Sequence, residues 1–110
     1  MFISFPSGSY INVLPPEDGR LNLLSSGGTA SATVAMAPDE RLALHHLAQA
    51  AAICPGVSAR LELAGAGSIS LTRGPNHASV TVTDEEQVAA DVCGVLHVQE
   101  LANATAPIDD

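Results

Sequence analysis

Lysine is absent from this chain of 110 residues, and its positive charge comes from four scattered arginines. Twelve aspartates and glutamates oppose them, so the net charge at pH 7 is −8. Without lysine, a Walker phosphate loop and a Schiff base with a carbonyl substrate or pyridoxal phosphate are both excluded. Nucleic acids and anionic lipids are bound through clustered cations, so the composition argues against a partner of either kind. The four arginines, which do not form a cluster in the sequence, are Arg20, Arg41, Arg60 and Arg73.

Aromatic residues and long apolar runs are also scarce. Phe2, Phe5 and Tyr10 are the only aromatic side chains, so we expect a core of leucine, valine, isoleucine and alanine. No apolar run has the length of a membrane span, and the residues after Met1 lack the basic and apolar regions of a signal peptide. We therefore expect a cytoplasmic protein with Cys54 and Cys93 reduced; a disulfide between them is the alternative.

Short apolar runs separated by proline and glycine predict several β-strands. Their number predicts an α+β fold with one antiparallel sheet of about five to seven short strands and two helices packed on one face. The expected strands are Phe2–Phe5, Tyr10–Leu14, Leu21–Leu24, Thr29–Met36, Ser58–Leu63, Ser68–Thr72 and Ala78–Val82. We expect tight turns at 25–28 and at 64–67; Gly65-Ala66-Gly67-Ser68 lacks the third glycine of a dinucleotide-binding fingerprint.

Two helices are predicted from their start signals. Proline followed by two acids at Pro38-Asp39-Glu40 favours a helix that runs to about Cys54. Apolar residues at three- and four-residue spacing then mark its buried face, which consists of Leu44, Leu47, Ala48 and Ala51. The pattern Thr83-Asp84-Glu85-Glu86 is typical of a capping box and predicts a second helix that continues to about Leu101.

Residues 32–40 and 78–86 match in character, since both lead from a strand into an acid-started helix. This match predicts an internal β-β-α pseudo-repeat; the alternative is that any two strand-to-helix transitions share such residues. We expect a single domain over residues 1–103, with 104–110 as a disordered acidic tail.

Histidines and cysteines are the candidates for chemistry. Neighbouring helical residues point about 100° apart, so His45 and His46 should separate, one at the packing edge and the other in solvent. Cys93 and His97 are four residues apart on the expected second helix and would share a face, which gives two ligands for a soft metal. Further ligands would have to come from His77, Cys54, His45 or His46. The alternative is a buried Cys93 beside a surface His97, and we assign no catalytic, cofactor-binding or metal-binding residue.

Paired carboxylates occur at Glu17-Asp18, Asp39-Glu40 and Asp84-Glu85-Glu86. We place the first pair in a loop and the other two groups at helix starts, where solvation and helix stability explain them without general acid–base catalysis.

These exclusions favour a non-catalytic interaction module with a protein partner, acting through its acidic surface or through a sheet edge such as Phe2–Phe5 or Ser58–Leu63. A homodimer is one form of such an interaction. A second hypothesis is a phage-encoded inhibitor, such as an anti-CRISPR protein, that presents acids to the basic groove of a nucleic-acid-handling complex. A third is a small hydrolase or metalloenzyme that uses the histidines and cysteines named above.

Overall fold

The computed structural model describes residues 1–25, 30–65 and 67–107. Within these residues the order β-β-β-β-α occurs twice. The first unit consists of β1 (Phe2–Ser4), β2 (Tyr10–Val13), β3 (Arg20–Leu24), β4 (Ser31–Ala35) and α1 (Pro38–Ile53). The second consists of β5 (Ser58–Glu62), β6 (Ser68–Arg73), β7 (Ala78–Thr83), β8 (Val88–Cys93) and α2 (Val95–Ala104). The α+β class is therefore confirmed.

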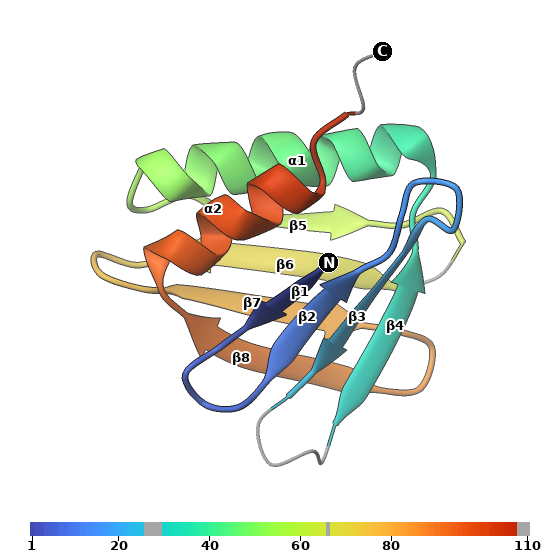
Figure 1. Cartoon of the computed structure of the whole chain (residues 1–110), viewed down its shortest axis with the longest axis horizontal. Helices are drawn as coiled ribbons and strands as arrows, with labels where there is room; N and C mark the ends of the chain where they lie inside the picture. Colours follow the sequence, from blue (N-terminus) through green and yellow to red (C-terminus); the bar gives the residue numbers. More distant parts are fainter. Residues whose placement is uncertain (26–29, 66, 108–110) are drawn as a thin grey trace.

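The strands form two antiparallel sheets of four, in the orders β1-β2-β3-β4 (sheet A) and β5-β6-β7-β8 (sheet B). Our expectation of one sheet with five to seven strands is wrong, because in the part of the chain that the structure describes the first four strands do not pair with the last four. Sheet A crosses in front of sheet B in Figure 1, and the two helices lie together along one side. Helix α1 packs on β5 and β6, whereas α2 packs on α1 and β1, so the helices do not share one face of one sheet.

The core lies between the inner faces of the sheets and beneath the helices. Alternate strand residues are buried, as expected for sheets with one solvated face. Leu44, Ala48 and Ala51 of α1 are fully buried and Leu47 is partly so, which confirms the predicted helix face. The remaining core is aliphatic, with its largest members on the strands: Ile3, Ile11, Leu21, Leu23, Ile69, Leu71, Val80 and Val82.

The second helix begins later than the sequence predicts. Residues 84–87 form a hairpin turn closed by a hydrogen bond from Asp84 N–H to the Gln87 carbonyl (2.9 Å), and Val88–Cys93 is a strand. The predicted capping box is therefore wrong. An Asp side chain that accepts backbone N–H groups stabilises a turn as readily as a helix start, so the short sequence pattern does not distinguish them.

The expected pseudo-repeat is wrong in its unit and its alignment. The repeated element order has four strands and a helix, and helices start at residues 38 and 95. Residues 32–40 lead into α1, but residues 78–86 lead into another strand. The two segments therefore occupy different places in their units.

Sheets A and B approach each other closely at Asp91 and at Gly67. Asp91 on β8 accepts hydrogen bonds from the hydroxyls of Ser7 and Ser9 in the β1–β2 turn. Gly67 has a φ of +94°, and a Cβ at this position would collide with the Thr83 carbonyl and touch the Val34 side chain.

Parts of some expectations lie outside the described residues. They are the turn at 25–28 over residues 26–28, the start of the fourth expected strand at Thr29, the loop at Ala66, and the end of the tail at 108–110. Thr105, just after α2, is buried and donates a hydrogen bond from its hydroxyl to the Leu101 carbonyl (2.8 Å).

Candidate functional site

Four chain segments meet at one end of the molecule, on the right of Figure 1. They are the β2–β3 loop, the start of α1, the β5–β6 turn and the β7–β8 turn. Backbone contacts join them: Met36 N–H donates to the Gly19 carbonyl (2.7 Å), and the pair Ser68–Thr83 brings the two turns of sheet B to the same side. All three carboxylate groups singled out in the sequence lie on these segments. With Glu62, the acids of this end (the acidic end) are Glu17, Asp18, Asp39, Glu40, Glu62, Asp84, Glu85 and Glu86.

Glu40 holds the start of α1 against the β5–β6 turn. One carboxylate oxygen accepts the N–H of Ala37, which precedes the helix, and the other accepts the N–H of Ala64; both distances are 2.8 Å. These two backbone hydrogen bonds lower the pKa of Glu40, because they stabilise its charged form. The acid predicted to stabilise a helix start therefore also joins two of the four segments.

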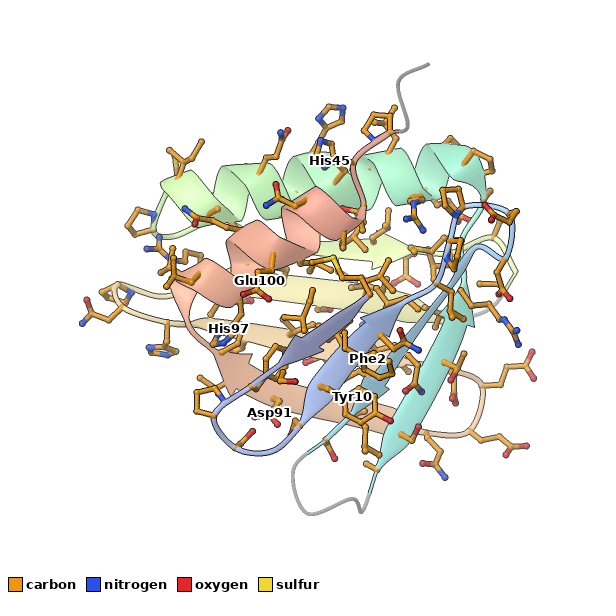
Figure 2. The ribbon with its side chains drawn as sticks, in the orientation of Figure 1. Phe2, Tyr10, His45, Asp91, His97 and Glu100 are labelled. Atoms are coloured by element: carbon orange, nitrogen blue, oxygen red, sulfur yellow. The ribbon has the colours of Figure 1, made fainter. Side chains whose placement is uncertain are left out.

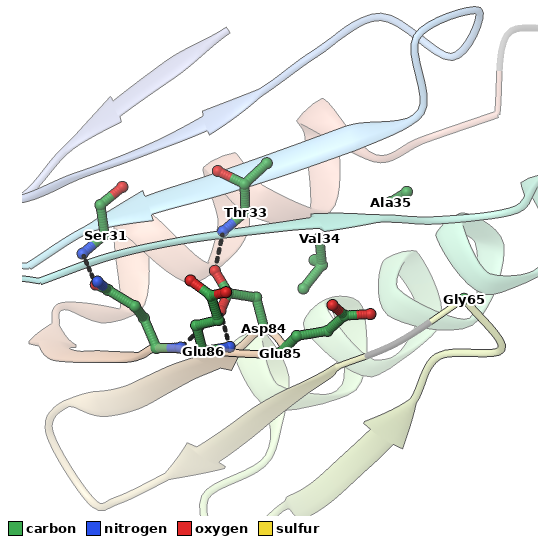
Figure 3. Close-up of a pocket in the computed structure, with 9 residues that line it drawn as sticks. Ser31, Thr33, Val34, Ala35, Gly65, Asp84, Glu85 and Glu86 are labelled. Atoms are coloured by element: carbon green, nitrogen blue, oxygen red, sulfur yellow. Dashed lines mark hydrogen bonds between the residues drawn. The ribbon is translucent and has the colours of Figure 1, made fainter.

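Asp84 organises the β7–β8 turn and connects it to sheet A. Its Oδ1 accepts the N–H groups of Glu86 (2.8 Å) and Gln87 (2.7 Å), and its Oδ2 accepts the N–H of Thr33 on β4 (3.3 Å; Figure 3). These bonds, led by the one from Glu86, lower the pKa of Asp84. Gln87 Oε1 accepts the N–H of Ser31 (3.5 Å).

An open groove of about 580 Å³ lies between β4 and the β7–β8 turn. Asp84, Glu85 and Glu86 line one side of it, and the other side is the outer edge of β4 (Figure 3). Glu85 and Glu86 are exposed. The groove therefore presents carboxylates and strand hydroxyls, and none of the described residues that line it carries a positive charge.

The arginines of the acidic end are already engaged. Arg20 pairs with Asp18 (2.5 Å), and Arg60 pairs with Glu62 (2.6 Å), both as exposed ion pairs. The Arg20 guanidinium, mainly through its hydrogen bond, lowers the pKa of Asp18. Of the eight carboxylates, only these two form ion pairs in the described part of the chain.

Arg41 is the third arginine of this end, and it is buried at 8% exposure. Its guanidinium donates to the carbonyls of Leu14 (2.9 Å) and Ala104 (2.8 Å), which ties α1 to the β2–β3 loop and to the end of α2. Burial lowers the pKa of Arg41, since the charged form loses solvation. Among the described residues, the acidic end therefore has eight carboxylates against three arginines, which leaves an excess of negative charge.

The structure separates the histidines that the sequence singled out. His45 is buried and its Nδ1 lies 2.6 Å from the Ala102 carbonyl, whereas His46 is exposed, which confirms the expected division of this pair. His77 is exposed near the β6–β7 turn. His97 is half-buried: its Nδ1 accepts the N–H of Gly94 (3.0 Å), and its ring packs edge-on against Phe5.

The cysteines are both free, with Cys54 exposed and Cys93 buried. Cys93 lies on β8 and His97 on α2, so the expected placement of both on one helix face is wrong. Burial, with a smaller effect from the Asp91 carboxylate, raises the pKa of Cys93 to about 11. Over residues 1–25, 30–65 and 67–107, no three histidine, cysteine or acidic side chains converge in a geometry that could hold a metal ion.

No protein-family model, curated protein or solved structure matches the chain. Neither α1 nor α2, the helices of the described residues, combines the length and apolarity that crossing a bilayer requires.

Sequence reasoning found the acidic groups but missed their convergence. The signal was present in the strand order, because successive turns of an antiparallel meander fall at alternate ends of the sheet. Had β8 been predicted as a strand, the β5–β6 and β7–β8 turns would have been assigned to one end. The mistaken second helix removed that information.

Proposed function

We propose that this protein is an interaction module whose acidic end binds a positively charged surface of a protein partner. The observation that carries the proposal is the convergence of eight carboxylates from four segments on one end. Only Asp91 and Glu100, among the acids of the described residues, lie elsewhere, and Figure 2 shows both away from the right-hand end.

Like charges brought together in this way repel one another, so the arrangement costs stability in the isolated protein. A cationic partner removes this repulsion and gains attraction that steers association over roughly 8–10 Å at physiological ionic strength. Glu40 and Asp84 are held by backbone hydrogen bonds, whereas Glu85 and Glu86 project from a turn and are the first available to a partner.

The experiment compares two charge reversals that change the net charge equally. Glu85→Arg alters the acidic end, and Glu100→Arg alters an acid on α2 (Figure 2). Partners are recovered from the native host with wild-type protein as bait, and the affinity of the recovered partner is then measured for each variant over a series of salt concentrations.

We expect Glu85→Arg to weaken binding about tenfold or more, Glu100→Arg to change it less than about twofold, and raised salt to weaken wild-type binding. Equal effects of the two reversals, or affinity independent of salt, would contradict the proposal. Failure of the wild-type bait to recover a partner would contradict it as well.

A second candidate function uses the same end: inhibition of a nucleic-acid-handling complex by occupation of its basic groove. Acids in first helical turns count against such mimicry, and the sequence predicts this position for Asp39, Glu40, Asp84, Glu85 and Glu86. Asp39 and Glu40 do lie in the first turn of α1, but the other three do not lie in a helix. Asp84, Glu85 and Glu86 lie in an exposed hairpin turn beside three other acidic segments, and this position favours binding to a basic groove. The two candidates differ in an activity assay of the recovered partner, since only the inhibitor should reduce the partner's own binding or cleavage of DNA or RNA.

A further inference from the structure

Sheets A and B leave four edge strands, namely β1, β4, β5 and β8. Edge strands expose backbone groups that pair with other chains, and proteins protect them by shortness, charge or covering groups. Strand β1 has three residues, β5 carries the Arg60–Glu62 ion pair, and on β4 the N–H groups of Ser31 and Thr33 are bonded by Gln87 and Asp84. Strand β8 has six residues and no charge on its outer face, and a side chain bonds only one of its outward N–H groups among the described residues, that of Val92.

The backbone groups of alternate β8 residues point away from β7. The Asp84–Gln87 bond sets the alternation of the antiparallel ladder, in which Ala89, Asp91 and Cys93 face β7. Val88, Ala90 and Val92 therefore face outward. The Val92 N–H is bonded by the Asp91 carboxylate (2.7 Å), whereas those of Val88 and Ala90 have no partner among the described residues.

The side chains of these three residues lie together on the outer face of sheet B. Val88 is 59% exposed, Val92 is 53% exposed, and Ala90 between them is exposed as well. The order Val, Ala, Val reads the same in both directions along the strand. A contact between two copies of one chain about a two-fold axis requires such self-complementarity.

We propose that two copies of this chain form a homodimer in which their β8 strands pair antiparallel about a two-fold axis at Ala90. The two Ala90 residues exchange backbone hydrogen bonds, and Val88 N–H donates to the carbonyl of the partner's Val92. The Val92 N–H exchanges the Asp91 carboxylate for the carbonyl of the partner's Val88, and Asp91 keeps its hydrogen bonds from Ser7 and Ser9. Val88 of each copy packs against the partner's Val92, and the two copies of sheet B become continuous.

The charge distribution favours this arrangement over other ways of joining two copies. Strand β8 starts next to the acidic end and finishes at the start of α2 (Figure 1). Antiparallel pairing therefore points the two acidic ends in opposite directions. It also brings Glu85 and Glu86 of one copy toward the start of the partner's α2, where the helix dipole is positive.

The mass of the protein in solution tests the dimer directly. Sedimentation equilibrium over a concentration series should give twice the chain mass of 11.2 kDa, and Val92→Glu should return the mass to that of one chain. Val92 is half exposed, so this variant should keep the wild-type circular dichroism spectrum. A single-chain mass for wild type at all concentrations, or a dimer unchanged by Val92→Glu, would overturn the proposal.

Cross-linking tests the position of the axis. In a Cys54→Ser background, Ala90→Cys should form a disulfide between copies, since hydrogen-bonded antiparallel pairs lie at a Cα separation of roughly 5.5 Å. Arg60→Cys on the β5 edge is the matched control and should stay reduced. Equal or faster cross-linking of Arg60→Cys would place the contact on β5 and refute the β8 dimer.

Discussion

Replacing Arg41 by methionine tests whether the buried guanidinium holds three parts of the fold together. Arg41 bonds the carbonyls of Leu14 and Ala104, and its charge is attracted by the Glu17 carboxylate without a close ion pair among the described residues. Methionine fills a similar volume and keeps the apolar packing of the side-chain stem. The two carbonyls lose their donors at a position where Arg41 itself is nearly inaccessible to solvent.

Two opposing effects determine how much stability Arg41→Met loses: the loss of two hydrogen bonds and the removal of a buried charge. Hydrogen bonds to a charged group contribute roughly 1.5–3 kcal/mol each, and two are removed. Removing a guanidinium whose pKa is lowered by burial returns part of this, because its charged form is poorly solvated in the fold. We therefore expect Arg41→Met to lower the free energy of unfolding by roughly 2–3 kcal/mol, which corresponds to a fall in Tm of roughly 10 °C.

Urea unfolding curves for wild type, Arg41→Met and the control Arg60→Met measure this loss. Arg60 forms an exposed ion pair with Glu62, so its replacement should cost less than about 1 kcal/mol. Arg41→Lys should lie between wild type and Arg41→Met, since one ammonium group replaces a planar fork that reaches two carbonyls. A loss below about 0.5 kcal/mol for Arg41→Met, or one equal to that of Arg60→Met, would refute the reasoning.

Three further outcomes are expected. Alkylation at pH 8 should modify Cys54 quickly and Cys93 slowly, because a thiol with a pKa of about 11 is ionised to about one part in a thousand; rapid loss of both thiols would contradict the buried placement of Cys93. Gly67→Ala should lower the free energy of unfolding by roughly 2 kcal/mol, as measured in urea, whereas Gly65→Ala, which meets no atom within 4 Å, should change it little. Glu40→Gln should lower Tm at pH 7, and this difference should shrink as pH falls from about 4.5 through the lowered pKa of the folded state, because the extra stability is complete while the unfolded carboxyl is ionised and is lost once the folded carboxyl is protonated as well; a difference that does not shrink as pH falls would contradict the proposed role.

The first half of the fold could be predicted because its local signals agree with one another. Proline and two acids start α1, and the three- and four-residue spacing of its apolar residues gives the buried face. The second half failed at Thr83–Glu86, where the same side-chain hydrogen bonds suit a helix start and a hairpin turn. The alternating burial along Val88–Cys93 shows a strand, and its valines were the available signal.

Tertiary structure decides what the sequence leaves open about the site. The separation of His45 from His46 follows from helix geometry alone and was predicted. The meeting of Glu40 with Ala64, and of Asp84 with Thr33, depends on how two sheets cross, which no local pattern encodes. The role of Arg41 was missed for the same reason. The role of a charged residue on an apolar helix face cannot be predicted until its carbonyl partners are known.

The uneven placement of acids also makes the molecule a strong electric dipole. On a cationic chromatography resin or a positively charged sensor surface, a single chain, such as the monomeric Val92→Glu variant, should adsorb in one orientation, with the β2–β3, β5–β6 and β7–β8 connections against the support. The opposite end, where His77 and the exposed Cys54 lie, then remains accessible to solution. A label attached to Cys54 would accordingly lie on the side of each adsorbed chain that faces away from the support.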